Sequence, residues 1–178
     1  MVDNMNLLFR IFLAINATSW MYVVYYIKCG KTFLGFTEWI CSLILLFIPM
    51  VLSWISLKFL KFFGDDTLNE CQEFSLADNE FLPTYLGYFF VSLSVPNDSV
   101  MVYLYFIVFV FTFLSQTQYF NPIFLVFGYH YYHILTKQGT RVFVITKGNV
   151  FRNKNDIVFE NLKRINDTTY IQFKEGSK

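Results

Sequence analysis

The longest stretch of the chain without a charged residue runs from Ser99 to Thr136 and reads SVMVYLYFIVFVFTFLSQTQYFNPIFLVFGYHYYHILT. A helix needs about 20 mostly apolar residues to cross the hydrocarbon core of a bilayer, so this stretch is too long for one crossing. Four residues interrupt it: Gln116, Gln118, Asn121 and Pro122. We therefore predict a crossing over 99–118, a break, and a helical extension over 122–135 that leaves the membrane. The alternative is a fifth, short crossing.

Three further runs lack charged residues: Ile11–Ile27, Trp39–Leu57 and Phe81–Asn97. The chain is 55% apolar and only 15% charged, whereas soluble domains are about 45–50% apolar and about 25% charged. This composition excludes a disordered chain, a basic nucleic-acid-binding arm and most soluble enzymes. The fold class predicted is an α-helical polytopic membrane protein with about four transmembrane helices, over 7–27, 36–60, 81–97 and 99–118.

Two positions inside the predicted helices carry unusual residues. Pro49 lies in the middle of the second helix, where it removes a backbone hydrogen bond and predicts a kink. Arg10 lies near the start of the first helix, where a long side chain can reach the headgroups. In one interpretation, Pro49 and the polar break at Gln116, Gln118, Asn121 and Pro122 surround a cavity. In the other, the break is a hinge at the membrane surface.

Positive charge is concentrated after residue 136. The segment 137–178 carries nine Lys and Arg residues and a net charge of +5, and the rest of the chain carries −4. The positive-inside rule places this tail in the cytoplasm. Six of its cations are the candidate partner-binding residues: Arg141, Lys147, Arg152, Lys154, Lys163 and Arg164.

The tail has short alternating runs separated by turn residues, which predict a small β-hairpin or meander. It is too short for a core of its own, so we expect it to pack on the membrane helices, on another subunit or on a partner. The sequence thus predicts a transmembrane helical domain over 1–136 and a basic β-rich tail over 137–178. The loop Lys61–Glu80, with a net charge of −5, suggests docking onto the basic tail, within one chain or between subunits. The alternative is a solvated connector.

No catalytic motif is found. His130 and His133 would lie on one face of the predicted helical extension and could share a metal ion. No third ligand is evident nearby, and the tyrosines between them are typical of an interfacial aromatic belt. Cys29, Cys41 and Cys71 form no CxxC pair. We expect no enzyme activity, no metal and no cofactor.

Three features of the layout carry a family resemblance. They are the Asn121-Pro122 break, the segment Gly128-Tyr-His-Tyr-Tyr-His133, and the tail segment Arg164-Ile-Asn-Asp-Thr-Thr-Tyr170. With four membrane segments in a short chain, they resemble the KwaA family, the membrane subunit of the bacterial Kiwa antiphage defence system.

The resemblance implies a homo-oligomer in the bacterial inner membrane, with a tetramer expected. It also implies a cytosolic DNA-binding partner that resembles KwaB, and a role in sensing membrane disturbance. The chain itself would then contact no nucleic acid. Our functional expectation is a non-enzymatic sensor or anchor. The alternative is an ion channel or pore-forming effector, in which Pro49 and the polar break gate or line a pore.

Overall fold

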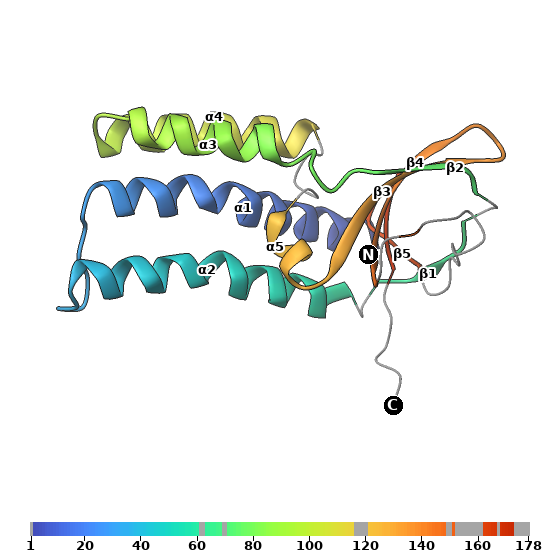
Figure 1. Ribbon diagram of the computed structural model, residues 1–178, viewed down its shortest axis with the longest axis horizontal. Helices are drawn as coiled ribbons and strands as arrows, with labels where there is room; N and C mark the ends of the chain where they lie inside the picture. Colours follow the sequence, from blue (N-terminus) through green and yellow to red (C-terminus); the bar gives the residue numbers. More distant parts are fainter. Residues whose placement is uncertain are drawn as a thin grey trace. The chain divides into compact units, whose positions relative to one another are not determined.

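The computed structural model describes residues 2–60, 63–68, 71–115, 121–148, 151, 162–166 and 168–172. These residues form helices followed by strands, with two strands early in the chain (Figure 1). They divide into two compact units, one of residues 1–56 with 80–121 and one of residues 57–79 with 122–178. We call them the helical unit and the sheet unit.

The helical unit consists of four helices: α1 (Val2–Lys28), α2 (Glu38–Phe59), α3 (Leu82–Ser94) and α4 (Asp98–Ser115). Among the described residues, three segments are long and apolar enough to cross a membrane: Leu7–Lys28, Glu38–Phe59 and Asp98–Ser115. The chain therefore has the helices of a membrane protein, as the apolar runs predict.

Helix α3 is the short member of the unit. It has 13 residues and a proline in its first turn, and at 1.5 Å per residue it is about 20 Å long. Its end follows from the sequence, because Val95 is extended (ψ 127°) as the residue before a proline prefers to be. The predicted crossing over 81–97 is thus a helix, but one too short to count among the three candidate spans.

Aromatic and sulfur-containing side chains pack α1 against α3 and α4. The buried residues of this core are Met21, Tyr25, Tyr85, Tyr88, Val95 and Met101. Polar contacts join α1 and the segment after it to the α3–α4 turn. Lys28 donates to the Val95 carbonyl at 2.7 Å, and Lys31 pairs with Asp98 at 2.6 Å. The loop after α1 and the turn before α4 therefore lie at the same end of the helical unit.

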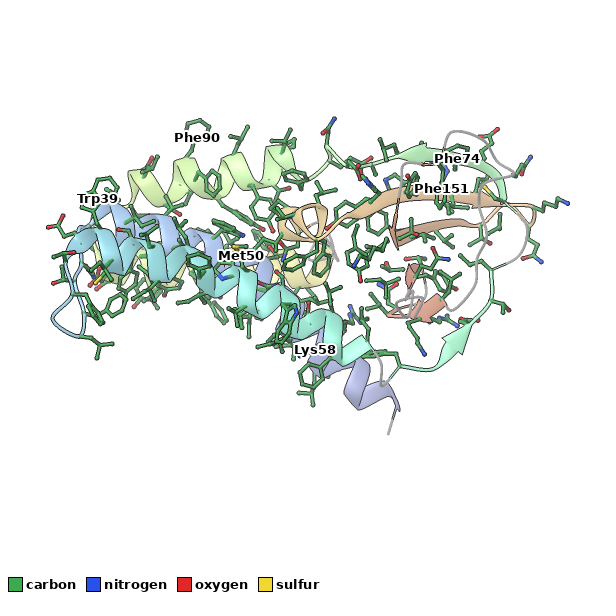
Figure 2. All side chains as sticks on the ribbon, turned by 60° about the horizontal axis from the view of Figure 1, so that its bottom comes forward. Trp39, Met50, Lys58, Phe74, Phe90 and Phe151 are labelled. Carbon is green, nitrogen blue, oxygen red and sulfur yellow. The ribbon has the colours of Figure 1, made fainter. Side chains whose placement is uncertain are left out.

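Large apolar side chains cover the outside of α2, α3 and α4 (Figure 2). Trp39 on α2 is 83% exposed, and Phe90 on α3 is 67% exposed. A soluble monomer rarely exposes so much contiguous apolar surface, whereas lipid tails accept it at no cost. The side-chain arrangement thus agrees with the composition.

The sheet unit is built on six strands in the order β1-β5-β6-β4-β3-β2. Their bounds are β1 (Asp65–Asp66), β2 (Cys71–Leu76), β3 (Tyr129–Thr136), β4 (Arg141–Lys147), β5 (Leu162–Arg164) and β6 (Thr169–Gln172). Neighbouring strands are antiparallel except β4 and β6, which are parallel. One face of the sheet buries an apolar cluster formed by Tyr132, Ile134, Val142, Val144, Leu162 and Tyr170.

The predicted helical extension over 122–135 is wrong beyond its first turn and a half. Helix α5 spans only Pro122–Val126, and β3 begins at Tyr129. Gly128 ends the helix with φ +77°, a left-handed conformation that glycine adopts without strain. The following aromatic and β-branched residues then pair on both sides, with β2 and with β4.

The tail is likewise not a separate hairpin or meander. Strands β1 and β2 come from the acidic loop that precedes α3, and they pair with β5 and β3. Docking of the acidic loop onto the basic tail is therefore confirmed, within one chain. The contact includes an ion pair between Asp66 and Arg164 at 3.9 Å. The compact units consequently differ from the predicted division at residue 136, since residues 57–79 and 122–136 lie with the tail.

Candidate functional site

A cluster of buried polar side chains lies inside the helical unit around Ser53 of α2. The Ser53 hydroxyl accepts hydrogen bonds from the Nδ2 atoms of Asn16 (2.8 Å) and Asn121 (3.0 Å). It donates to the Pro49 carbonyl at 2.8 Å. Asn16 and Ser53 are fully buried, and Asn121 is 1% exposed. We call these four residues the Ser53 cluster. It joins α1, α2 and the segment that precedes α5.

One polar atom of the Ser53 cluster, the side-chain oxygen of Asn16, has no hydrogen-bond donor among the described residues. Asn16 Oδ1 is buried and has no hydrogen-bond partner among the described residues. A buried amide oxygen without a partner costs free energy, so this cluster is under-satisfied. It contains no titratable group, so it offers hydrogen bonding and not acid–base chemistry.

The structure brings together Pro49 of α2 and one residue of the predicted polar break, Asn121, through the hydroxyl of Ser53. Pro122 follows directly as the first residue of α5. Gln116 and Gln118 lie outside the described residues. The sequence analysis missed Asn16 and Ser53. The available signal was their polarity in long apolar helices, where polar side chains bond across helices.

The two histidines do not share a face. Both lie on β3, and an odd spacing on a strand points side chains to opposite sides of the sheet. His130 Nδ1 lies 2.7 Å from Asp78 Oδ2, and the other oxygen of Asp78 accepts from the Tyr131 amide at 2.8 Å. The His133 ring packs on Phe143. The part of the chain that the structure describes holds no group of three metal-binding side chains.

The candidate partner-binding cations do not form one patch. Arg141 and Lys147 are the first and last residues of β4, so about 20 Å of strand separates them. Arg164 lies near Asp66, and Lys163 is paired in register with Asp65. Arg152 and Lys154 lie outside the described residues.

Folding also changes the charge that a partner would meet. Residues 57–79 carry a net charge of −3 and residues 122–178 carry +5, so the sheet unit as a whole carries +2. The strongly basic tail thus becomes a weakly basic unit with individual exposed cations. Arg141 and Lys147 are exposed and have no ion pair among the described residues, which makes them the strongest of the six candidates.

Comparison with protein families gives a match over nearly the whole chain. The family described as anti-phage protein KwaA matches residues 9–171. The chain belongs to the KwaA family. Comparison with curated proteins and with solved structures gave no match.

Membership of the KwaA family confirms the resemblance found in the sequence and supports a role in antiphage defence. The matched range contains all four helices of the helical unit from Phe9 onward and every strand of the sheet unit up to Ile171. The match therefore takes in the acidic strands and the basic strands together with the helices.

The buried tyrosines of the KwaA sheet unit predict a loss of stability in alkali. Burial raises the pKa of Tyr129 and of Tyr132 above the ordinary value. A tyrosine in the unfolded chain ionises at about pH 10. Below that pH the free energy of unfolding keeps its full value, because the tyrosines are protonated in both the folded and the unfolded state. The free energy of unfolding falls as the pH rises further, because the tyrosines of the unfolded state release their protons at a lower pH than those of the folded state.

Denaturant midpoints measured by circular dichroism below and above about pH 10 test this prediction. The wild type should lose stability across this range more steeply than the double variant Tyr129→Phe/Tyr132→Phe. Equal pH dependence in the two proteins would contradict it.

Proposed function

We propose that this KwaA-family chain is a non-enzymatic membrane sensor or anchor that recruits a cytosolic DNA-binding partner through its sheet unit. The observation that carries the proposal is the position of the α3–α4 hairpin in the chain. It lies between strand β2 and strand β3 of one sheet. A displacement of the hairpin in the membrane would therefore pull on two neighbouring strands at once.

The same connection supports four membrane crossings. Strands β2 and β3 pair directly, so both must lie on one side of the membrane, because a sheet cannot assemble across a bilayer. The segment between them must then cross an even number of times. Since α4 is long enough to cross, we propose that the shorter α3 crosses with it. Helices α1 and α2 add two more crossings.

Charge supports a cytoplasmic sheet unit and an inner-membrane location. With four crossings, only Lys28 and Lys31 among the 14 Lys and Arg residues lie at the end away from the sheet unit. Cytoplasmic loops of membrane proteins carry the excess of Lys and Arg. The proposal places the C-terminus in the cytoplasm, where a DNA-binding partner would be accessible.

The recruitment step can be tested by co-purification from cells that express the chain together with a DNA-binding protein of the KwaB type. The double variant Arg141→Glu/Lys147→Glu is expected to recover at least about tenfold less partner, which corresponds to about 1.4 kcal/mol. The control is Lys31→Gln, in the loop after α1. Because Lys31 pairs with Asp98, an unchanged melting midpoint must verify that this control is folded. Unchanged recovery in the double variant would contradict recruitment through these cations.

The proposal includes self-association into a homo-oligomer, with a tetramer expected from the family resemblance. The exposed apolar faces of α2, α3 and α4 are compatible with either lipid or another copy. Native mass spectrometry of the detergent-solubilised chain measures the number of copies, and a monomer at all concentrations would contradict this part of the proposal.

A channel is the second candidate, and the Ser53 cluster is the observation that favours it. Polar side chains at the centre of a membrane protein often mark ion or water pathways, and Asn16 Oδ1 has no partner among the described residues. Conductance across planar bilayers discriminates between the two candidates. A current that Asn16→Leu abolishes supports the channel, and the absence of current under membrane tension and voltage argues for the sensor.

A further inference from the structure

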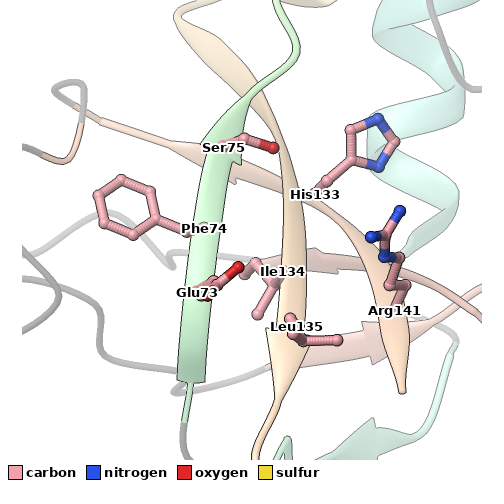
Figure 3. A pocket seen from close by; sticks show the side chains of 7 residues that line it. All are labelled: Glu73, Phe74, Ser75, His133, Ile134, Leu135 and Arg141. Carbon is pink, nitrogen blue, oxygen red and sulfur yellow. The ribbon is translucent and has the colours of Figure 1, made fainter. Parts of the chain in front are cut away.

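A hollow of about 380 Å³ opens on the sheet unit where β2, β3 and β4 lie side by side (Figure 3). Seven residues from three strands line it: Glu73, Phe74 and Ser75 of β2, His133, Ile134 and Leu135 of β3, and Arg141 of β4. Phe74 and Ile134 belong to the apolar cluster on the other face of the sheet. The proposed partner recruitment uses only Arg141 of these residues.

The strand register explains why these side chains meet. Leu135 is opposite Glu73 on one side and opposite Arg141 on the other, and His133 is opposite Ser75. Residues directly opposite each other in antiparallel strands share a face of the sheet. Neighbouring strands are about 4.8 Å apart, so the backbones of Glu73 and Arg141 are about 10 Å apart, with Leu135 between them.

The charged side chains of the hollow, Glu73 and Arg141, do not contribute hydrogen bonds or ion pairs to the described part of the fold. Within the described part of the chain, the side chains of Glu73, Ser75 and Arg141 make no hydrogen bond and no ion pair. Other polar side chains of the sheet unit do have partners: His130 hydrogen-bonds to Asp78, and Arg164 forms an ion pair with Asp66. Glu73 and Arg141 instead leave a gap between an acid and a base, above an apolar floor.

We propose that the hollow binds a small zwitterion, with an ammonium group at Glu73 and an oxyanion at Arg141. A guanidinium binds phosphate or carboxylate oxygens through two parallel hydrogen bonds. Ser75 and His133 add hydrogen-bonding groups beside it, and the Glu73 carboxylate accepts hydrogen bonds from the ammonium. Leu135 contacts the short carbon linker between the two charges. Phosphoethanolamine has this chemistry, either free or as a lipid headgroup.

The arrangement also predicts selectivity. A quaternary ammonium has no N–H to donate to Glu73, and aromatic faces are the groups that recognise it in other proteins. His133 is the one aromatic lining residue on the face that carries Glu73 and Arg141, and a single ring does not form such a cage. Inorganic phosphate would occupy only the Arg141 side of the hollow.

Calorimetry on the full-length chain in a non-ionic detergent tests the proposal, with O-phosphoethanolamine as the probe. We expect binding that Glu73→Gln and Arg141→Gln each weaken at least tenfold, while Lys147→Gln at the opposite end of β4 leaves it unchanged. Phosphocholine and inorganic phosphate should each bind at least tenfold more weakly. The substituted side chains are exposed, and unchanged melting midpoints will verify that each variant is folded.

Several results would overturn the proposal: no binding at millimolar probe, equal binding of inorganic phosphate, or no effect of Glu73→Gln. Repeating the titration in nanodiscs identifies the source of the ligand. Competition by phosphatidylethanolamine, but not by phosphatidylglycerol, assigns a lipid headgroup, and unchanged binding assigns a free metabolite. The assay contains no partner protein, so its failure leaves the recruitment proposal standing.

Discussion

A fragment containing only residues 137–178 is expected to remain unfolded, although it includes the whole predicted β-rich tail. It retains β4, β5 and β6 but lacks β3, the strand that pairs with β4 along its full length. It also lacks Tyr132 and Ile134, which are 0% and 1% exposed in the intact sheet. A chain of about 40 residues without disulfides or metal rarely folds alone.

A second fragment provides the matched comparison. Joining residues 57–79 to residues 122–178 through a short Gly/Ser linker restores all six strands of the sheet. Circular dichroism in mild detergent should then show strand signal and a cooperative thermal transition for the joined fragment only. A cooperative transition in the 137–178 fragment would contradict this prediction.

Replacing Ser53 with alanine is expected to destabilise the helical unit by about 2 kcal/mol. The substitution removes the acceptor of the Asn16 amide, which is fully buried, and one hydrogen bond of Asn121. A buried donor left without an acceptor costs about 1–3 kcal/mol. Interhelical hydrogen bonds in membrane proteins average about 0.6 kcal/mol each, which keeps the expected total in the middle of this range and below its upper end.

The chain offers a closely matched control on the same helix. Ser42 also donates to the carbonyl four residues earlier, at 2.8 Å, but its bond is exposed and it joins no second helix. Unfolding of the purified protein in mixed detergent and SDS should shift for Ser53→Ala and hardly at all for Ser42→Ala. Equal shifts would show that the Ser53 cluster contributes nothing to the association of α1 and α2.

The membrane character of the chain was predictable from the sequence, because it depends mainly on the lengths of the apolar runs. The strand Tyr129–Thr136 could not be predicted in the same way. Its residues follow an apolar run and resemble the end of a membrane helix, and nothing nearby indicates that β2 and β4 will pair with them. The periodicity of a short segment does not show which distant segments will pair with it.

The candidate sites show the same division between local and non-local information. Pro49 and Asn121 were recognisable because proline and asparagine are conspicuous in apolar segments. Asn16 and Ser53 became significant only through their hydrogen bond, which joins residues 37 positions apart. Asp78 was one of several acids in a loop, and only the folded structure shows that it hydrogen-bonds to His130.

The separation of β2 from β3 has a consequence for biosynthesis. Residues 77–128, including the α3–α4 hairpin, leave the ribosome between the two strands. Strand β2 therefore cannot pair with β3 until the whole α3–α4 segment has been synthesised. A hairpin inserted with only one crossing would leave β2 and β3 in different compartments, and the sheet would never close. In the proposed four-crossing topology, closure of the sheet thus requires that α3 and α4 have both crossed, and a chain with only one of these crossings would keep β2 and β3 apart.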